Sequence, residues 1–215
     1  MNEEILELKA ALDTCFTGQI TATAFWHDTE PQAPVRTDSY SIKNLRNLVL
    51  LEHYYNFQLW HVEDQARRKD VPASIIADCK RQVDKLNQMR NDCIEEVDRC
   101  LHAILLPLIP QGATTRQNTE TAGMALDRLS ILALKIYHME EQTKREDVDE
   151  QHIRNCSAKL ATLRKQRNDL VVAVLELITD YVQGNKVPAL YSQFKMYNDP
   201  SLNPELYSQG SQGSR

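Results

Sequence analysis

Apolar residues recur every three or four positions along most of the chain, in long stretches that turn-forming residues separate. This spacing matches an α-helix that buries one face. It predicts four long helices, over about residues 42–69, 73–106, 119–145 and 149–183, and a short amphipathic helix over residues 3–15. The chain is therefore expected to be an all-α protein.

Capping and helix-breaking residues define the ends of these helices. Ser41 or Asp38 is placed to cap the helix that follows, and Pro72 falls near the first turn of the next one. Pro107 ends that helix because a proline ring cannot continue helical hydrogen bonding. Gly184 ends the last long helix, since glycine accepts the left-handed conformation common after helix C-termini.

Polar and turn-forming residues predict the loops. HDTEPQAPVRTDS at residues 27–39 and QGATTRQNT at residues 111–119 connect the helices. The tail KMYNDPSLNPELY carries turn signals and no helical repeat, so it is expected to be irregular. Residues 208–215, SQGSQGSR, have the composition of a disordered end. Residues 1–207 are accordingly interpreted as a single helical domain.

Two parts of the sequence repeat each other. WHVEDQARRKDV at residues 60–71 aligns with YHMEEQTKREDV at residues 137–148, and the same offset of 77 aligns QMRND with KQRND. Thirteen of the thirty-eight positions in 60–97 are identical to their counterparts. We interpret this as a duplication of a helical hairpin. The expected fold is an up-down bundle of two duplicated hairpins, over 42–105 and 119–182 within the wider segments 41–106 and 119–184.

Polar side chains interrupt the apolar faces of these helices. A helical projection places them among the inward-facing residues or beside them. The candidate polar pocket consists of Glu52, His53, Asn56, Glu63, Arg67, Lys80, Asn87, Arg90, Asn91, Asp98, Asp127, Arg128, Lys135, Glu140 and Arg167. The same projection turns His61, Asp92 and Asp169 towards solvent, so His61 is not expected to be a ligand.

Two interpretations of these inward charges stay open. A buried charge is costly unless it is paired and hydrogen-bonded, so they either form salt bridges that fix helix register or line a pocket for an anion. Glu63 with Arg67, or Glu63 with Lys80, would be such salt bridges. Arg90, Arg167 and Lys135 are among the donors that an anion pocket would use. Because the first hairpin carries more of the polar residues, it is expected to supply most of any site.

Charge and composition exclude several classes of function. The net charge of −5 in 215 residues gives no basic excess to neutralise phosphates, so no nucleic-acid binding is expected. No secretory signal and no membrane-spanning apolar run is present, which favours the cytoplasm and no membrane insertion. The five cysteines lack zinc-binding spacing and are expected to be buried thiols.

Sequence motifs for catalysis are not found. The chain has no GxxxxGK[ST], GxGxxG, HExxH or GxSxG, and no paired Glu-x-x-His of a di-iron bundle. No metal and no cofactor is therefore expected. His53 beside Glu52 or Glu63 could act as a general base, although a histidine bonded within the interior is commoner. Whether the chain is an enzyme stays undecided at this level, as does self-association.

Four separated segments, LWHVEDQARR, KRQVDKLNQMRNDCIEEVD, NTETAGMALDRLSILALKIYHM and KMYNDPSLNPELY, together resemble the bacterial domain of unknown function 4254 family over about residues 45–207. The resemblance implies a cytoplasmic helical protein of a kind often encoded near glycosyltransferases of the lipopolysaccharide type. The chain is thus expected to be an accessory factor in cell-envelope glycan biosynthesis, with a glycosyltransferase or other envelope enzyme as partner. The alternative is an enzyme or binding protein for a phosphorylated or otherwise anionic small molecule in the polar pocket.

Overall fold

The computed structural model describes residues 3–37, 39–194, 196 and 199–207. Within these residues the protein is all-α, with helices and no strand. The helices are α1 (Glu3–Asp28), α2 (Ile42–Ala66), α3 (Ala73–Leu105), the short 3-10 helix η1 (Leu106–Leu108), α4 (Ala122–Thr143), α5 (Glu150–Val182) and α6 (Pro204–Tyr207). The four long helices predicted from the apolar repeat are therefore confirmed, with ends that differ by a few residues.

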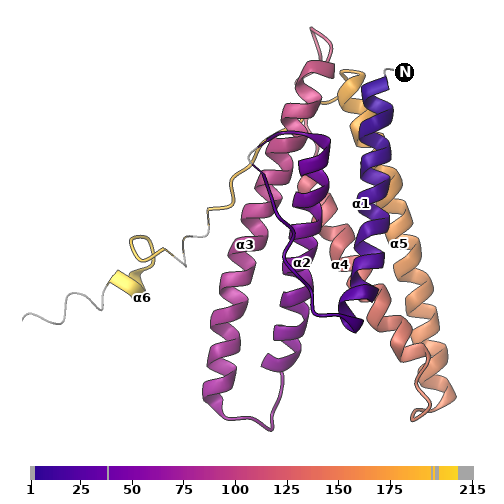
Figure 1. Cartoon of the computed structure of the whole chain (residues 1–215), viewed down its shortest axis with the longest axis vertical. Helices are drawn as coiled ribbons and strands as arrows, with labels where there is room; N and C mark the ends of the chain where they lie inside the picture. The colour runs from indigo at the N-terminus through magenta and orange to yellow at the C-terminus, as the bar shows by residue number, and fades with distance from the viewer. Residues whose placement is uncertain (1–2, 38, 195, 197–198, 208–215) are drawn as a thin grey trace, which may run out of the picture.

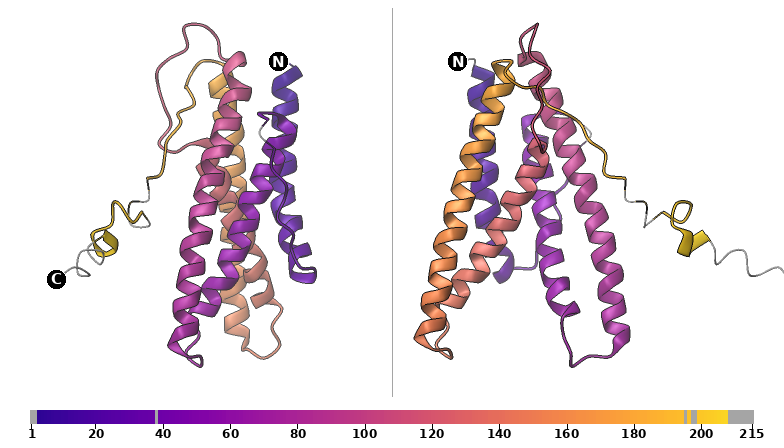
Figure 2. Two further views of the ribbon diagram at one scale, coloured as in Figure 1. Left: turned by 60° about the vertical axis from the view of Figure 1, so that its left-hand side comes forward. Right: turned by 180° about the vertical axis from the view of Figure 1, so that it is seen from behind.

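The long helices form two antiparallel hairpins, α2 with α3 and α4 with α5, and α1 lies along them (Figure 1). The hairpins are close together near the C-terminal ends of α3 and α5 and diverge towards the turns at 67–72 and 144–149 (Figure 2). No described helix is long and apolar enough to cross a membrane. The diverging end is where the polar side chains of the two hairpins come into reach of solvent.

The two turns contain the same ion pair. Arg68 donates two hydrogen bonds to the carboxylate of Asp70, and Arg145 donates two to Asp147, 77 positions later. This likeness agrees with a duplicated hairpin, and the duplication itself stays a prediction. Exposed pairs of this kind contribute at most about 1 kcal/mol, so their role is mainly to shape the turn.

Side-chain caps begin three of the helices. The Ser41 hydroxyl accepts a hydrogen bond from the main-chain N–H of Asn44, which confirms one of the two caps predicted for α2. Thr121 and Asp149 cap α4 and α5 in the same way. Gly184 has φ +74 directly after α5, the left-handed conformation predicted for its stop.

The prediction of a short first helix is wrong. Helix α1 continues to Asp28, thirteen residues beyond its expected end at Cys15. Its second half, GQITATAFWHD, is rich in threonine, which has low helix propensity. Packing compensates, because Phe16, Gln19, Thr23 and Trp26 are buried against the hairpins. Several threonine hydroxyls also donate to carbonyls one turn earlier, for example Thr23 to Gln19 at 2.8 Å.

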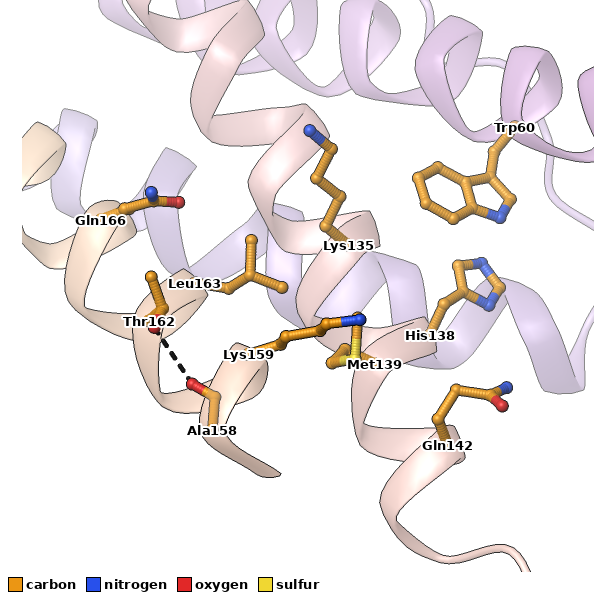
Figure 3. Close-up of a pocket in the computed structure, with 10 residues that line it drawn as sticks. All are labelled: Trp60, Lys135, His138, Met139, Gln142, Ala158, Lys159, Thr162, Leu163 and Gln166. Atoms are coloured by element: carbon orange, nitrogen blue, oxygen red, sulfur yellow. Dashed lines mark hydrogen bonds between the residues drawn. The ribbon is translucent and has the colours of Figure 1, made fainter. Parts of the chain in front are cut away.

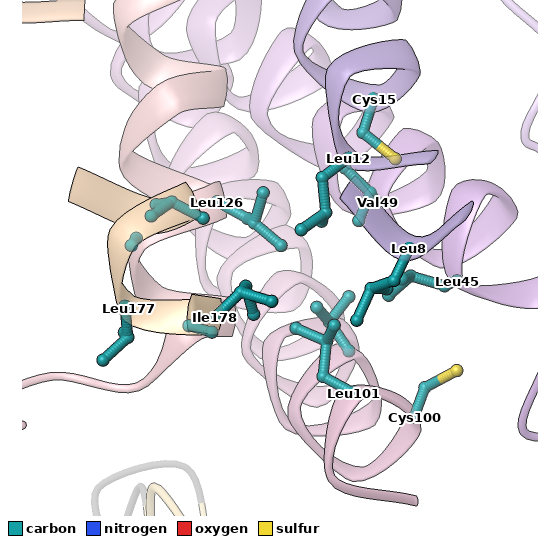
Figure 4. Packing of buried hydrophobic residues seen from close by; sticks show 14 of the residues in the cluster. Leu8, Leu12, Cys15, Leu45, Val49, Cys100, Leu101, Leu126, Leu177 and Ile178 are labelled. Atoms are coloured by element: carbon teal, nitrogen blue, oxygen red, sulfur yellow. The ribbon is translucent and has the colours of Figure 1, made fainter. Parts of the chain in front are cut away.

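The main core lies where α1 meets both hairpins (Figure 4). Leu8 and Leu12 of α1 are fully buried against Leu45 of α2, Leu126 of α4 and Ile178 of α5. Burying a leucine or isoleucine side chain stabilises a fold by about 1.5–3 kcal/mol. Helix α1 is therefore an integral part of the bundle.

The cysteines are buried as expected, and the tail contains one helical turn that was not expected. All five cysteines are buried free thiols, as expected. Burial raises the pKa of Cys15 to about 12, which keeps that thiol protonated. The tail is irregular except for α6, a single turn that the sequence pattern did not predict. The expected disorder of 208–215 lies outside the described residues.

Candidate functional site

A buried polar network joins the two hairpins in the middle of the bundle. Glu52, His53 and Asn56 occupy one face of α2 and are at most 4% exposed. Opposite them on α4, Ser130 is fully buried, and Asp127 keeps 15% of its side chain exposed. The Asn56 amide lies 2.8 Å from an Asp127 carboxylate oxygen and 3.0 Å from the Ser130 hydroxyl, and it also donates to Glu52. Four predicted site residues, Glu52, His53, Asn56 and Asp127, therefore come together, and Ser130 joins them.

Hydrogen bonding determines the proton positions on His53. The Thr23 hydroxyl donates its only proton to the Gln19 carbonyl, so His53 Nε2, 3.0 Å from that hydroxyl, must be the donor of the pair. His53 Nδ1 then accepts from the Ser130 hydroxyl at 2.7 Å. Burial lowers the pKa of His53 to about 3, and the charge of Arg167 acts in the same direction while a backbone contact with Gln19 opposes it. His53 is therefore a neutral structural histidine, which disfavours its predicted alternative role as a general base.

Glu52 and Asp127 form a carboxyl pair within this network. Burial raises the pKa of Glu52 well above its ordinary value, and the charge of Asp127 and a hydrogen bond to it add to the effect. Arg90 on α3 opposes the shift and lies 3.8 Å from Asp127. The raised pKa of Glu52 favours its protonated form, and Arg90 lies beside the other carboxyl group of the pair. The contact of Arg90 with Asp127 is of the kind that the salt-bridge interpretation describes.

Several predicted site residues lie outside the network. Five of them take part in surface ion pairs: Arg67 with Glu63 at 2.7 Å, Lys80 with Asp84, Arg128 with Glu120 at 2.5 Å, and Glu140 with Arg164 at 3.0 Å. The pairing of Glu63 with Arg67 is the one predicted, whereas Glu63 with Lys80 does not form. Glu63 and Arg67 line a cleft together with Asn56, Asn87 and Arg90, whereas Lys80, Arg128 and Glu140 do not line it. These charges therefore do not all face one common pocket.

Arg167 does not repeat the environment of Arg90, despite their equivalent positions in the repeat. Arg167 is 7% exposed and donates to the main-chain carbonyl of Phe16 on α1. Burial lowers its pKa, and no ion pair involves it among the described residues. The difference arises because α1 covers the second hairpin at this level, whereas Arg90 reaches the space between the hairpins.

Asp98, Asn87 and Asn91 are three further predicted site residues on α3. The Asp98 side chain faces the start of α4, where its carboxylate accepts a hydrogen bond from the main-chain N–H of Gly123 at 2.7 Å. Burial raises its pKa to about 6, while hydrogen bonds from Thr121 and Gly123 act against that shift. Asn91 is buried, and Asn87 lines a small cleft with Asn56 and Arg90. Asp98 is thus a helix-capping residue rather than part of a pocket.

A cleft of about 690 Å³ opens where the hairpins diverge, between α2, α4 and α5. Trp60 and His138 form one wall, with their rings stacked 4.7 Å apart and nearly parallel (Figure 3). Lys135 and Lys159 extend across it from α4 and α5 (Figure 3). Met139, Leu163 and Thr162 line the floor between the two lysines, and Gln142 and Gln166 lie at the rim.

The larger cleft carries positive charge. None of the described residues that line it is acidic, and neither Lys135 nor Lys159 has an ion-pair partner within the described chain. The smaller cleft, about 340 Å³, lies on the other side of Trp60 and contains Glu63, Asp64, Arg67 and Arg90, so its charges balance. Of the predicted anion donors, only Lys135 lines the larger cleft.

Sequence reasoning missed three parts of this region. Lys159 lies on the exposed part of the helical projection, and the pattern does not distinguish Trp60 from an ordinary core residue. Neither was therefore predicted as a site residue. His61, expected to face solvent, lies beside Phe57 and His138 instead. Gln19 and Thr23 belong to the part of α1 that was not predicted. Their four-residue spacing is the one signal that could have marked them as a buried polar pair.

Comparison with known proteins gives one match. Residues 46–189 match the sequence model of the family described as Protein of unknown function (DUF4254), which covers the network and both clefts. The predicted resemblance is thereby confirmed, although the match ends before the tail. No curated protein and no solved structure matches the chain.

Proposed function

The chain belongs to the DUF4254 family, and on the geometry of its clefts we propose that it binds an anionic small molecule between its two hairpins. The observation that carries this proposal is the larger cleft, where two unpaired lysines lie beside a stacked aromatic wall. The expected ligand has a phosphate or carboxylate group and a flat or apolar part.

Each part of the cleft matches one part of such a ligand. An ammonium group donates charge-assisted hydrogen bonds to a phosphate, and a bond to a charged group contributes about 1.5–3 kcal/mol when it is shielded from water. Lys135 and Lys159 are exposed, so the lower end of that range applies. The stacked rings of Trp60 and His138 offer an apolar surface against which a ring can pack. A ligand with both an anionic group and a ring therefore matches the cleft better than a ligand with only one of them.

Phenyl phosphate tests this proposal as a probe that has both parts. It is expected to bind more tightly than inorganic phosphate, because only the ester can use the aromatic wall. Replacing both lysines (Lys135→Gln with Lys159→Gln) should weaken binding about tenfold or more, equivalent to about 1.4 kcal/mol. Isothermal titration calorimetry at low ionic strength measures both differences, and added salt should weaken binding further.

Lys165→Gln is the matched control, because Lys165 lies on the same helix as Lys159 but pairs with Asp169 outside the cleft. This variant should bind phenyl phosphate as the wild type does. Equal affinity of the double lysine variant and the wild type would contradict the proposal, as would an absence of any preference for the phenyl ester.

A second candidate function is the accessory role in envelope glycan assembly, in which the chain docks onto a glycosyltransferase. The tail favours it, because its apolar side chains are exposed: Phe194 is 86% exposed and Met196 57%. Leu190 and Tyr191 are about half exposed beside them. The tail is also held in place, since the main-chain N–H of Gln193 donates to the Glu95 carboxylate and the Tyr191 hydroxyl donates to the Gln117 side chain.

Co-purification with a glycosyltransferase of the lipopolysaccharide type tests the docking role. The wild-type chain is expected to retain the enzyme on an affinity column, and Phe194→Ala should reduce the retained amount severalfold. Val172→Ala, at an apolar side chain on α5 that is 53% exposed, is the control. If Phe194→Ala retains as much enzyme as the wild type, the tail is not the docking site.

A further inference from the structure

Three histidines from three helices meet beside the aromatic wall of the larger cleft. His27 comes from the end of α1, His61 from α2 and His138 from α4. One ring nitrogen of each lies within 4.8 Å of the corresponding nitrogens of the other two. The rings are steeply inclined to one another, at 67° between His27 and His61, 74° between His27 and His138 and 80° between His61 and His138. They surround a common point rather than stack.

Hydrogen bonds leave one particular nitrogen available on two of these rings. His27 Nδ1 donates to the Thr23 carbonyl at 2.7 Å, and His138 Nδ1 donates to the Glu141 carboxylate at 2.7 Å. The Nε2 atoms of both rings are buried, and neither has a hydrogen-bond partner among the described atoms. A carbonyl or carboxylate on the far nitrogen is the arrangement that orients metal-bound histidines and raises their basicity.

The two unpartnered nitrogens are unfavourable in either protonation state. In the neutral rings, two buried lone pairs lie near each other without a donor. In the protonated rings, two N–H groups and two positive charges do so instead. A buried polar atom without a partner costs about 1–3 kcal/mol, so such groups need an explanation. A cation bound between the rings would satisfy both at once.

We propose that His27, His61 and His138 form a binding site for a divalent transition metal of the zinc class. Imidazole nitrogen is a preferred ligand for these ions. Three histidines with no fourth protein ligand among the described His, Cys, Asp and Glu side chains is the composition of an open site, in which water or a ligand takes the remaining position. This role goes beyond anion binding and does not depend on it.

The surroundings agree with a bound cation. The carboxylate of Glu141 lies 2.7 Å from His138 Nδ1 and places negative charge beside the cluster. Ligand nitrogens about 2.0–2.1 Å from a tetrahedral ion lie about 3.3 Å apart. The three rings, whose nitrogens lie within 4.8 Å of one another, would therefore move slightly closer together around the ion.

The main alternative is that the rings only pack together. His27 stacks on Tyr137 at 4.1 Å and contacts Phe57 edge-on, as a core aromatic residue would. Packing explains the burial of the rings. It explains neither the unpartnered Nε2 atoms of His27 and His138 nor the hydrogen bond from His138 to the Glu141 carboxylate. Because the ligands come from α1 and from both hairpins, a bound metal would also link the three parts of the bundle.

Zinc titration of the metal-free, full-length chain tests the site. We expect one equivalent to bind, and excess zinc at a hundredfold over Kd to raise the thermal midpoint by about 5–10 °C. Co²⁺ should give the visible absorption of a low-coordinate nitrogen site. His61→Gln should abolish stoichiometric binding. Glu141→Gln, at a carboxylate 49% exposed, should keep the fold and weaken binding about 10–100-fold.

His102→Gln is the control, since His102 lies on α3 outside the cluster, and it should bind zinc as the wild type does. The double lysine variant should also bind zinc normally, which separates this test from that of the anion cleft. Wild-type protein without stoichiometric binding would overturn the proposal. Undiminished binding in a folded His61→Gln variant, or in Glu141→Gln, would overturn it too.

Discussion

Replacing Gly123 with alanine is expected to destabilise the protein by about 3 kcal/mol or more and to lower its thermal midpoint by about 6–12 °C. Gly123 lies in the first turn of α4, beside Asp98 and Ile94 of α3. An added Cβ would lie 2.8 Å from the Asp98 carboxylate and 2.8 Å from the Ile94 carbonyl. The main-chain oxygen cannot move aside, so the helices must separate, and the hydrogen bond from the Gly123 amide to Asp98 would then be lost.

Gly18→Ala is the matched control for this prediction. Gly18 also lies within a helix, but nothing is found within 4 Å of the position that a Cβ would take. Alanine should therefore stabilise α1 by about 0.5–1 kcal/mol, because it restricts the unfolded chain more than glycine does. Thermal or urea unfolding of the three proteins measures both effects. A Gly123→Ala protein as stable as the wild type would show that α3 and α4 are not in close contact there.

His53→Gln is expected to cost about 2–3 kcal/mol at pH 7.5, and this cost should shrink as the pH falls. The variant loses the stacking of the imidazole on Trp26 and its hydrogen bonds with Thr23 and Ser130. The pKa of His53 is lowered from 6.5 to about 3 in the folded protein. Between these two pH values His53 is protonated in the unfolded chain and neutral in the folded one. Wild-type stability conferred by neutral His53 is therefore complete above pH 6.5 and decreases down to about pH 3.

The measurement is urea unfolding of wild type and His53→Gln at several pH values. Their difference should decrease by about 1.4 kcal/mol for each pH unit between 6.5 and 3. Taking a difference is necessary because the raised pKa values of Glu52 and Asp98 act on the wild type with the opposite sign. A difference that does not vary with pH would mean that His53 is protonated equally in both states.

Glu52→Gln provides the control within the same network. The pKa of Glu52 is raised above 4.5, so above that pH the unfolded chain loses a proton that the folded chain retains. Wild-type stability should therefore decrease as the pH rises above 4.5, while glutamine, which cannot ionise, is unaffected. The variant should gain on the wild type with rising pH, the reverse of the trend for His53→Gln.

The helices were predictable because their signal is local. A helix that buries one face repeats its apolar residues every three or four positions, whatever it packs against. The bounds of α3 and α5 accordingly agree with the prediction to within one or two residues. Helix α1 was underestimated for the converse reason, since its threonine-rich half is helical only because the hairpins bury Phe16, Thr23 and Trp26.

The inward direction of Glu52, His53, Asn56 and Asp127 was also predictable, because a helical projection determines which face a residue occupies. The projection could not show where along its length an inward face packs against another helix and where it does not. Arg90 and Arg167 have equivalent positions in the repeat, yet Arg90 reaches the cleft and Arg167 is buried under α1. Lys80 and Arg128 do not reach the space between the hairpins and pair with surface carboxylates instead.

The sequence by itself thus determined the all-α class, the two hairpins and the polar residues between them, since each depends on spacing along a single helix. The tertiary structure alone decided how the helices cross. That crossing produces the cleft of Lys135 and Lys159, the close approach at Gly123 and the meeting of His27, His61 and His138. These features join residues from two or three helices, and their separation in the chain carries no periodic signal. Distances between helices depend on the packing of the whole bundle.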